Sequence, residues 1–136
     1  MDSVMVMDTS AWFTLAEAEA GADEVEAYWA EAWLARVTVH ASFVSLAELE
    51  YIRTQEQGPE SAAELIAWVE KQPVQWHHSD DVLCSAAAKL KAAHRISFSD
   101  SFVAALAQRL DATLVHKDPE FNALGGVLNL DMLPPK

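Results

Sequence analysis

The sequence predicts an α/β fold in which a central, mostly parallel sheet is covered by helices on both faces. Short apolar runs alternate along the chain with longer segments of helical periodicity, a pattern typical of parallel sheets. The 136 residues fit one domain spanning residues 1–136, and no glycine- or serine-rich linker divides them. Hydrophobic residues make up 51% of the chain and charged residues 22%, which is a globular composition.

The expected elements alternate along the whole chain. Strands are expected where short apolar runs are bounded by polar or turn residues, at residues 4–7, 37–41, 74–76, 113–115 and 127–130. Helices are expected where apolar residues recur every three or four positions, at residues 10–19, 22–35, 46–57, 60–71, 80–94 and 99–110. Gly21, Gly58 and Pro73 mark breaks between elements. Asp118 and Pro119 open a further short helical turn.

Two of these helices carry apolar patterns that we expect to be buried. In the segment 22–35, Trp29 and Trp33 recur at helical spacing and share one face. The alternative is that part of this face forms a groove for a partner peptide. In the fifth expected helix, Val82 and the single cysteine, Cys84, fall within an apolar pattern, so we expect both to be inward-facing.

The charge and cysteine content limit the possible functions. The net charge of −12, from 21 acidic residues against nine Lys and Arg, argues against a general nucleic-acid coat protein. It is compatible with a nuclease that holds divalent cations, because bound ions supply positive charge where the phosphate sits. One cysteine excludes an internal disulfide and favours a cytoplasmic location. We expect no signal peptide and no membrane-spanning segment.

Four acidic residues lie near the ends of the expected strands. Asp8 follows the first strand, and Glu48 lies in the first turn of the helix after the second strand. Asp118 follows the fourth strand, and Asp100 opens the helix that leads into it. In open parallel sheets, ligands bind beyond the carboxyl ends of the strands. We therefore expect these carboxylates to share one edge of the sheet.

Carboxylates gathered in this way need compensation. Like charges about 4 Å apart repel by several kcal/mol at a partly buried site. Hard cations such as Mg²⁺ or Mn²⁺ take oxygen ligands and relieve this repulsion. A cation held there can polarise a phosphodiester and activate a water molecule. The grouping therefore predicts metal-assisted hydrolysis.

Each acid also has an ordinary structural explanation. Asp8 and Asp118 are good N-cap residues for the helical segments that follow them. Glu48 follows Ser45 at the spacing of a capping box, and Asp100 follows a serine at the same spacing. Taken singly, each acid is explained at least as well by a cap. The metal site depends on their convergence.

Four ordered segments, each containing one of these acids, carry a family resemblance. They read VMDTSA at 6–11, SFVSLAEL at 42–49, ISFSDSFVAALA at 96–107 and LVHKDPEF at 114–121. Together they resemble the motifs of the PIN-domain nucleases, and within them the small toxin ribonucleases of the VapC type. The resemblance implies a three-layer α/β/α fold, Mg²⁺ or Mn²⁺ binding, endonucleolytic cleavage of RNA, homodimers, and inhibition by a small cognate antitoxin. It assigns the catalytic and metal-binding roles to Asp8, Glu48, Asp100 and Asp118.

Two residues depart from the family pattern. His116 stands where the family usually has Thr or Ser, two residues before the fourth acid. Imidazole is larger than a hydroxyl and can carry charge near neutral pH, so His116 is open to a structural role or to a supporting role beside Asp118. Asp111 stands where a glycine often turns the helix into the fourth strand. Because aspartate tolerates left-handed backbone geometry, we expect little consequence.

Four further residues are candidates for supporting roles. Thr9 and Ser10 are candidate hydrogen-bond donors to the metal-binding carboxylates, the alternative being ordinary hydroxyls at a helix N-terminus. Arg95 and Lys117 are candidates for contacting substrate phosphate, since they lie near two of the acids in the sequence. Their alternative is a solvated surface.

Three other functions fit parts of the sequence. An RNA-processing nuclease without an antitoxin would use the same chemistry. A phosphoacceptor receiver domain would need an acidic pair after the first strand, whereas Asp8 is followed by Thr9. A degenerate member that binds partners without catalysis stays open because of His116 and the acidic net charge.

Overall fold

Five parallel strands form one sheet in the computed structural model, which describes residues 3–135. The strand order is β3-β2-β1-β4-β5, and every neighbouring pair is parallel. The strands are β1 (Ser3–Met7), β2 (Val37–Ser42), β3 (Val74–His77), β4 (Thr113–His116) and β5 (Asn129–Met132). The helices are α1 (Thr9–Ala16), α2 (Ala22–Trp33), α3 (Phe43–Gln57), α4 (Pro59–Glu70), α5 (Asp81–Ala93), α6 (Phe98–Leu110) and the short 3-10 helix η1 (Pro119–Leu124).

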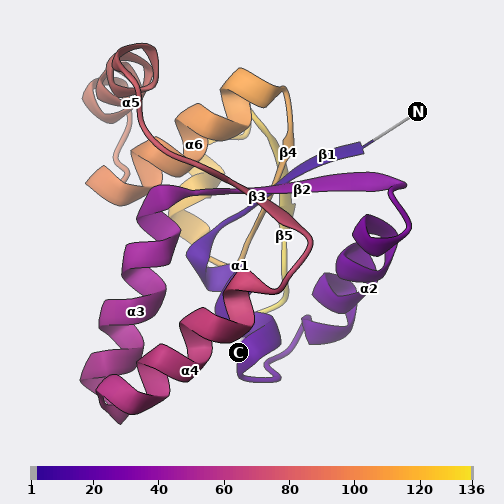
Figure 1. Ribbon diagram of the computed structural model, residues 1–136. Coiled ribbons are helices and arrows are strands. Elements are labelled where there is room, and N and C mark those ends of the chain that lie inside the picture. The colour runs from indigo at the N-terminus through magenta and orange to yellow at the C-terminus, as the bar shows by residue number, and fades with distance from the viewer. Residues whose placement is uncertain (1–2, 136) are drawn as a thin grey trace.

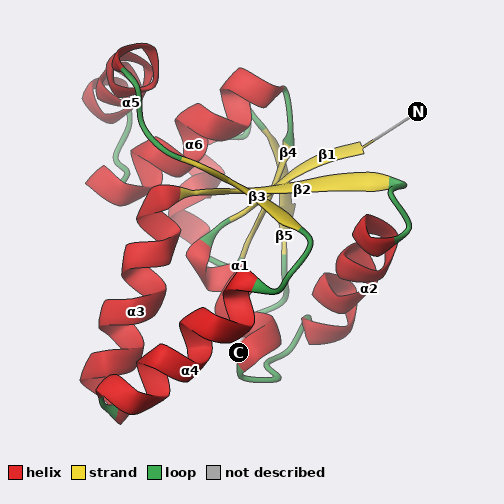
Figure 2. Cartoon of the chain, in the orientation of Figure 1, coloured by secondary structure: helices red, strands yellow, loops and turns green. Residues whose placement is uncertain are grey.

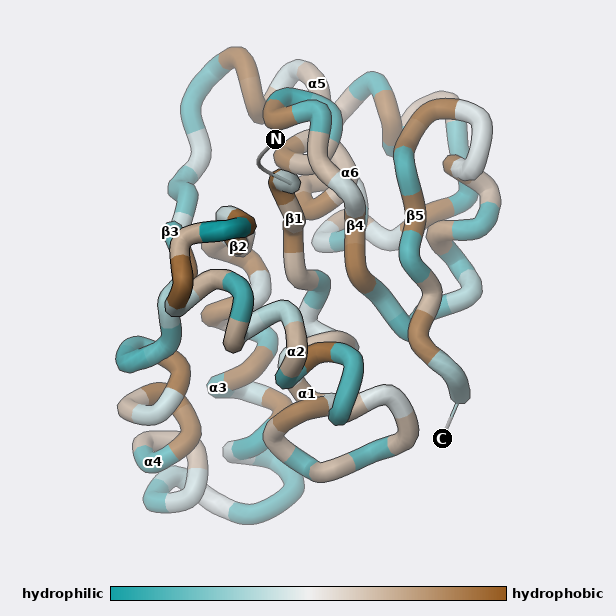
Figure 3. Tube along the Cα trace, turned by 90° about the vertical axis from the view of Figure 1, so that its right-hand side faces the viewer, coloured by the Kyte–Doolittle hydropathy of each residue, from teal (hydrophilic) through white to brown (hydrophobic). Residues whose placement is uncertain are grey.

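Helices cover both faces of the sheet, which confirms the predicted three-layer α/β/α fold (Figures 1 and 2). The alternation of side chains along β1 divides the interior into two cores. Met5 and Met7 join the core formed with α1, α2 and α4, while Val6 joins the core formed with α5 and α6. The paired strands β1 and β4 run side by side through the molecule and are largely hydrophobic (Figure 3). Within residues 3–135, no helix combines the length and apolarity needed to cross a membrane.

A cluster of tryptophans fixes α1 against its neighbours. Trp12 is fully buried and stacks on Trp76 at 5.4 Å between ring centroids. It also meets Trp29 and Trp68 edge-on, at 5.0 and 6.1 Å. Trp29 is buried as predicted, but Trp33 is 65% exposed, so the prediction that the whole tryptophan face of α2 is core was wrong. The cluster holds in place the helix that directly follows Asp8.

Helix α5 is less covered than its sequence indicated. It packs on α6 through Leu83, Ala87 and Leu90, which are buried. Val82 is 71% exposed and Cys84 is also exposed, so the predictions that these two side chains are inward-facing were wrong. The physical reason is that α5 lies at the periphery, where no further element covers its outer face (Figure 1).

The order in which successive strands join the sheet reverses between β1 and β4, so this is the topological switch point. It proceeds from β1 to β2 and β3 on one side, then returns to place β4 and β5 on the other side of β1. Such a reversal leaves a crevice beyond the carboxyl ends of the two adjacent strands. Asp111 ends α6 in the left-handed conformation (φ 49°, ψ 46°), as predicted, and directs the chain into β4.

Candidate active site

Asp8 lies at the carboxyl end of β1, beside the crevice. Its backbone N–H donates to the Val115 carbonyl of β4 at 3.0 Å, so the residue is tied to both strands. Its Oδ2 atom caps α1 by accepting from the backbone N–H and the hydroxyl of Ser10, at 3.2 and 2.5 Å. Its Oδ1 atom is buried and has no hydrogen-bond partner among the described residues. Burial raises the pKa of Asp8 to about 6, although the Ser10 hydrogen bonds oppose the shift.

Three other carboxylates gather across the same crevice. Oxygen atoms of Asp100, Asp118 and Glu120 all lie within 4.8 Å of one another. Asp100 comes from the first turn of α6 and is 7% exposed, while the other two come from the end of β4 and from η1. Burial raises the pKa of Asp100 to about 9, together with a hydrogen bond to Glu120 and the charges of Asp8, Asp118 and Glu120. These influences show that Asp8 belongs to the same electrostatic cluster.

Glu48 is held differently from the other acids. The N-cap of α3 is Ser42, not Ser45, so the capping-box explanation of Glu48 was wrong and Glu48 lies beyond the first turn. Its Oε1 atom accepts from the Thr9 hydroxyl at 2.7 Å, and its Oε2 atom accepts from the Ser99 hydroxyl at 3.2 Å. Its negative charge also contributes to the raised pKa of Asp8. Glu48 therefore adjoins the cluster with both oxygens already hydrogen-bonded.

The capping explanation holds for Asp118 without excluding a site, whereas the Asp100 carboxylate accepts no hydrogen bond from the Ser97 N–H among the described residues. Asp118 caps η1 by accepting from the Glu120 N–H at 2.9 Å, with Pro119 at the first helical position. Ser97, rather than Asp100 itself, caps α6 by accepting from the Asp100 N–H at 3.1 Å. A cap orients a carboxylate at a helix N-terminus, where the helix dipole favours negative charge. Capping thus helps to place these acids at one edge.

His116 is fully buried behind Asp118. Its Nδ1 atom lies 2.9 Å from the Asp118 carbonyl oxygen, so this nitrogen carries the proton and donates it. Its ring packs edge-on against Phe121 at 5.2 Å. Burial lowers the pKa of His116, which favours the neutral ring. The hydrogen bond and the packing both fix the segment that carries Asp118.

Of the four predicted supporting residues, Thr9 and Ser10 contact the four predicted acids, whereas no contact with these acids is found for the side chains of Lys117 and Arg95 among the described residues. Thr9 donates to Glu48 and Ser10 donates to Asp8, which is the geometry expected of supporting donors. The Ser10 hydroxyl also accepts from the Lys117 backbone N–H at 2.9 Å. The Lys117 ammonium is bound to Glu19 and to a carbonyl of the α1–α2 loop, with its side chain only 10% exposed. Arg95 is exposed in the segment before α6.

Glu120 is the residue of this cluster that sequence reasoning missed. Its signal was present, because a proline between two acids at the start of a helical turn places both in the same turn. The sequence reads Asp118-Pro119-Glu120, and the structure gives it that conformation.

Comparisons with known proteins identify the family and the fold. The PIN domain family model matches residues 5–127. The solved structures that resemble this chain include VapBC2 from Rickettsia felis bound to a DNA fragment from their promoter, with a TM-score of 0.77, 17% identity, and coverage of 96% of this chain and 99% of that one. They also include Mycobacterium tuberculosis VapC20, described as a sarcin-ricin loop cleaving toxin, with a TM-score of 0.72, 22% identity, and coverage of 89% and 95%.

A third similar structure is VapBC-1 from nontypeable Haemophilus influenzae, with a TM-score of 0.72, 20% identity, and coverage of 95% of this chain and 97% of that one. No curated protein sequence matches this chain significantly. At these identities the solved structures establish the fold, and the family model covers most of the sequence. The chain therefore belongs to the PIN domain family.

Proposed function

We propose that this protein is a metal-dependent endoribonuclease that acts in the cytoplasm as the toxin of a type II toxin–antitoxin pair. The observation that carries this proposal is the gathering of carboxylates in the crevice between β1 and β4 of a PIN domain. Asp8, Glu48, Asp100 and Asp118 are the proposed catalytic residues, with Asp8, Asp100 and Asp118 as metal ligands and Glu48 as the proton acceptor beside them. The choice of RNA as substrate is supported by VapC20, the sarcin-ricin loop cleaving toxin that shares the fold.

The residues present fit a hard divalent cation. All the candidate ligand atoms of the cluster are carboxylate oxygens, which favours Mg²⁺ or Mn²⁺ over metals that prefer nitrogen or sulfur. The buried Oδ1 atom of Asp8 has no partner among residues 3–135. A buried carboxylate oxygen without a donor is costly, and a cation would satisfy it.

The proposed mechanism assigns each side chain a task. A bound cation would polarise the phosphodiester and make a coordinated water more acidic. Asp8, Asp100 and Asp118 would hold the cation; helix caps fix Asp8 and Asp118, and the His116 hydrogen bond also fixes the Asp118 backbone. Glu48, held by two hydroxyls beside Asp8, accepts a proton from the attacking water. We assign the exposed Arg95 to contact with the substrate phosphate. Lys117 could contact the phosphate only after breaking its ion pair with Glu19.

Asparagine variants of two acids test this function. We expect Asp8→Asn and Asp100→Asn to abolish RNA cleavage and growth inhibition. The loss should exceed the roughly 10–100-fold effect typical of residues that only support metal ligands. Sequencing of cleaved RNA ends after brief induction gives the readout, and circular dichroism checks the fold. If both variants cut RNA as well as the parent protein does, the four-acid mechanism is wrong.

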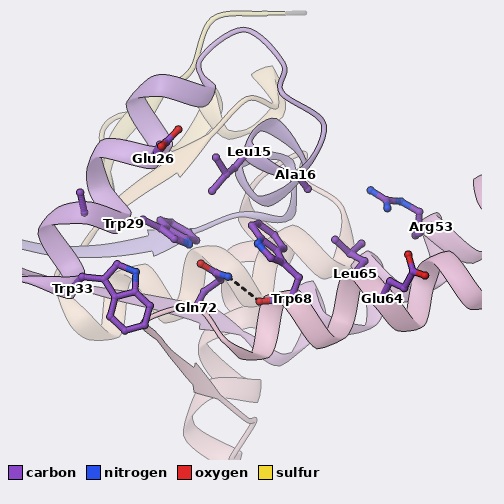
Figure 4. Close-up of a pocket in the computed structure, with 11 residues that line it drawn as sticks. Leu15, Ala16, Glu26, Trp29, Trp33, Arg53, Glu64, Leu65, Trp68 and Gln72 are labelled. Carbon is purple, nitrogen blue, oxygen red and sulfur yellow. Dashed lines mark hydrogen bonds between the residues drawn. The ribbon is translucent and has the colours of Figure 1, made fainter.

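A largely apolar groove between α1, α2 and α4 supports an antitoxin partner. Its volume is about 650 Å³ (Figure 4). Trp29, Trp33 and Trp68 line it, and its charged lining residues are two acids, Glu26 and Glu64, and one cation, Arg53. Solved structures that share the fold include a toxin–antitoxin complex from Klebsiella pneumoniae and a member of the VapBC family of toxin–antitoxin systems from Mycobacterium tuberculosis. We assign the groove to an antitoxin helix that carries apolar and basic side chains on one face.

The partner is tested by genetics and by binding. A short reading frame beside the gene that encodes an antitoxin would support this role, and its absence would favour an RNA-processing nuclease. Trp33 is 65% exposed at the groove, so Trp33→Ser should weaken capture of that antitoxin without unfolding the protein. Unchanged affinity would remove the groove from consideration.

A second copy of the chain is the other proposed protein partner. Val82, at the start of α5, and Phe98, at the start of α6, are each 71% exposed, and exposed large apolar side chains often mark an interface. We propose that they contribute to a homodimer. The double substitution Val82→Lys and Phe98→Lys should give a monomer in sedimentation experiments. A parent protein that is already monomeric would exclude the dimer.

A further inference from the structure

Glu120 stands outside the set of four acids on which the proposed function depends. We infer that Glu120 is a direct ligand of the metal ion, and that Glu48 positions the site through hydrogen bonds without binding the ion itself. This inference rests on the proposed function, because it concerns the same metal site. The sequence motifs assign metal binding to Glu48 and no role to Glu120. The inference gives metal binding to Glu120 and a positioning role to Glu48.

The geometry places Glu120 among the ligands. Its carboxylate has an oxygen within 4.8 Å of oxygens of both Asp100 and Asp118. Its backbone N–H donates to Asp118 Oδ1, so one turn of η1 fixes the two acids relative to each other. Pro119 restricts the backbone between them, and the fully buried Phe121 anchors the same turn. The site is therefore built rigidly around this carboxylate.

A separate observation points to a missing cation beside this cluster. Asp8 is 3% exposed, and its Oδ1 atom has no hydrogen-bond donor among the described residues. Its charge acts on Asp100, the central member of the cluster. A hard cation would serve the Asp8 oxygen and the three gathered carboxylates together, because it prefers several oxygen ligands.

Glu48 shows the opposite arrangement. Both of its carboxylate oxygens accept hydrogen bonds from hydroxyls, one from Thr9 on α1 and one from Ser99 on α6. The Ser45 hydroxyl lies 2.9 Å from the same Thr9 hydroxyl and extends this network. Glu48 and Asp8 both lie outside the group of carboxylates within 4.8 Å of one another, but Asp8 keeps a buried oxygen without a donor, whereas both Glu48 oxygens have one. Through these hydrogen bonds Glu48 joins α1, α3 and α6 around the site.

Calorimetry with Mn²⁺ distinguishes the two roles. We compare the parent with Glu120→Gln, Glu48→Gln and the control Glu60→Gln, which changes an exposed acid in the first turn of α4. We expect Glu120→Gln to weaken Mn²⁺ binding at least tenfold and Glu48→Gln to change it less than threefold. Glu48→Gln should still reduce RNA cleavage. Melting temperatures without metal verify that each variant is folded.

The outcomes separate this inference from the proposed function. Any other ranking of the Mn²⁺ affinities overturns the inference. It is overturned if Glu120→Gln binds Mn²⁺ as tightly as the Glu60→Gln control. It is also overturned if Glu48→Gln loses as much affinity as Glu120→Gln. A parent protein that binds Mn²⁺ but does not cleave RNA contradicts the proposed function, while the ranking of affinities still decides the role of Glu120. A parent that binds no Mn²⁺ at millimolar concentration overturns both.

Discussion

Replacing Ser10 with alanine tests how the two halves of the site are joined. The Ser10 hydroxyl donates to Asp8 Oδ2 at 2.5 Å and accepts from the Lys117 backbone N–H at 2.9 Å. It therefore links the residues that follow β1 and β4, on either side of the crevice. Alanine is a strong helix former, so the substitution removes these two hydrogen bonds without disfavouring α1.

The expected magnitude follows from the two bonds. A hydrogen bond to a charged group contributes about 1.5–3 kcal/mol and a neutral one about 0.5–1.5 kcal/mol. We therefore expect Ser10→Ala to lower the free energy of unfolding by about 2–4 kcal/mol, a large share of the 5–15 kcal/mol typical of a domain. The pKa of Asp8 should rise further, because its bonds to Ser10 oppose the effect of burial. Metal affinity should fall roughly 10–100-fold.

Urea unfolding and Mn²⁺ calorimetry measure these changes. Ser10→Thr keeps the hydroxyl and should remain close to the parent in both assays. Ser85→Ala, at an exposed position of α5, is the control for serine-to-alanine substitution in a helix. The reasoning is refuted if Ser10→Ala unfolds within about 0.5 kcal/mol of the parent and binds Mn²⁺ with unchanged affinity, since hydrogen bonds of the stated strength would be felt.

Two further predictions concern stability. Trp12→Ala should cost about 3–5 kcal/mol in urea unfolding, because the ring is fully buried among three other tryptophans; a loss under about 1 kcal/mol would contradict this packing. Burial lowers the pKa of His40 and of His77, whose rings are 2.8 Å apart, so the unfolded chain binds more protons than the folded protein below about pH 6.5. Proton binding by the unfolded chain therefore lowers the free energy of unfolding on acidification below that pH and has no effect above it. His77→Asn should reduce the fall in unfolding free energy between pH 7.5 and pH 5, and an equally steep fall in this variant would exclude the pair as its source.

Local rules located three of the acids correctly. Asp8, Asp100 and Asp118 each lie where a strand ends or a helix begins, and these boundaries are marked by apolar runs, serines and a proline in the sequence. The carboxyl-edge rule then brings the strand ends together. The parallel sheet and its two helical layers could be predicted for the same reason, because they follow from alternating local patterns.

The start of α3 could not be predicted in this way. Ser42 and Ser45 both precede the helix, and either serine could have served as its N-cap. In the structure Ser42 accepts from the Val44 N–H, while Ser45 lies within the helix and contacts Thr9 of α1. The choice is made by a contact between residues distant in the sequence, so the local pattern could not reveal that Glu48 is bound on both oxygens.

Exposure was the other property that the sequence did not determine. Periodicity identifies the apolar face of a helix, but it does not say whether another element covers that face. Val82 and Trp33 lie on such faces and remain exposed because α5 and the end of α2 are at the periphery. The burial of His116 behind Asp118 likewise depends on Phe121, a contact that only the folded chain forms.

The pairing of β1 with β4 has a consequence for the chain during its synthesis. Met5 pairs with Thr113 and Met7 with Val115, so the middle of the sheet joins the first strand to one that the ribosome makes much later. Contacts between such distant segments form late. A nascent chain that has not yet reached Thr113 contains Asp8, Glu48 and Asp100 but lacks both β4 and Asp118. Under the proposed function, we therefore expect such incomplete translation products to lack hydrolytic activity.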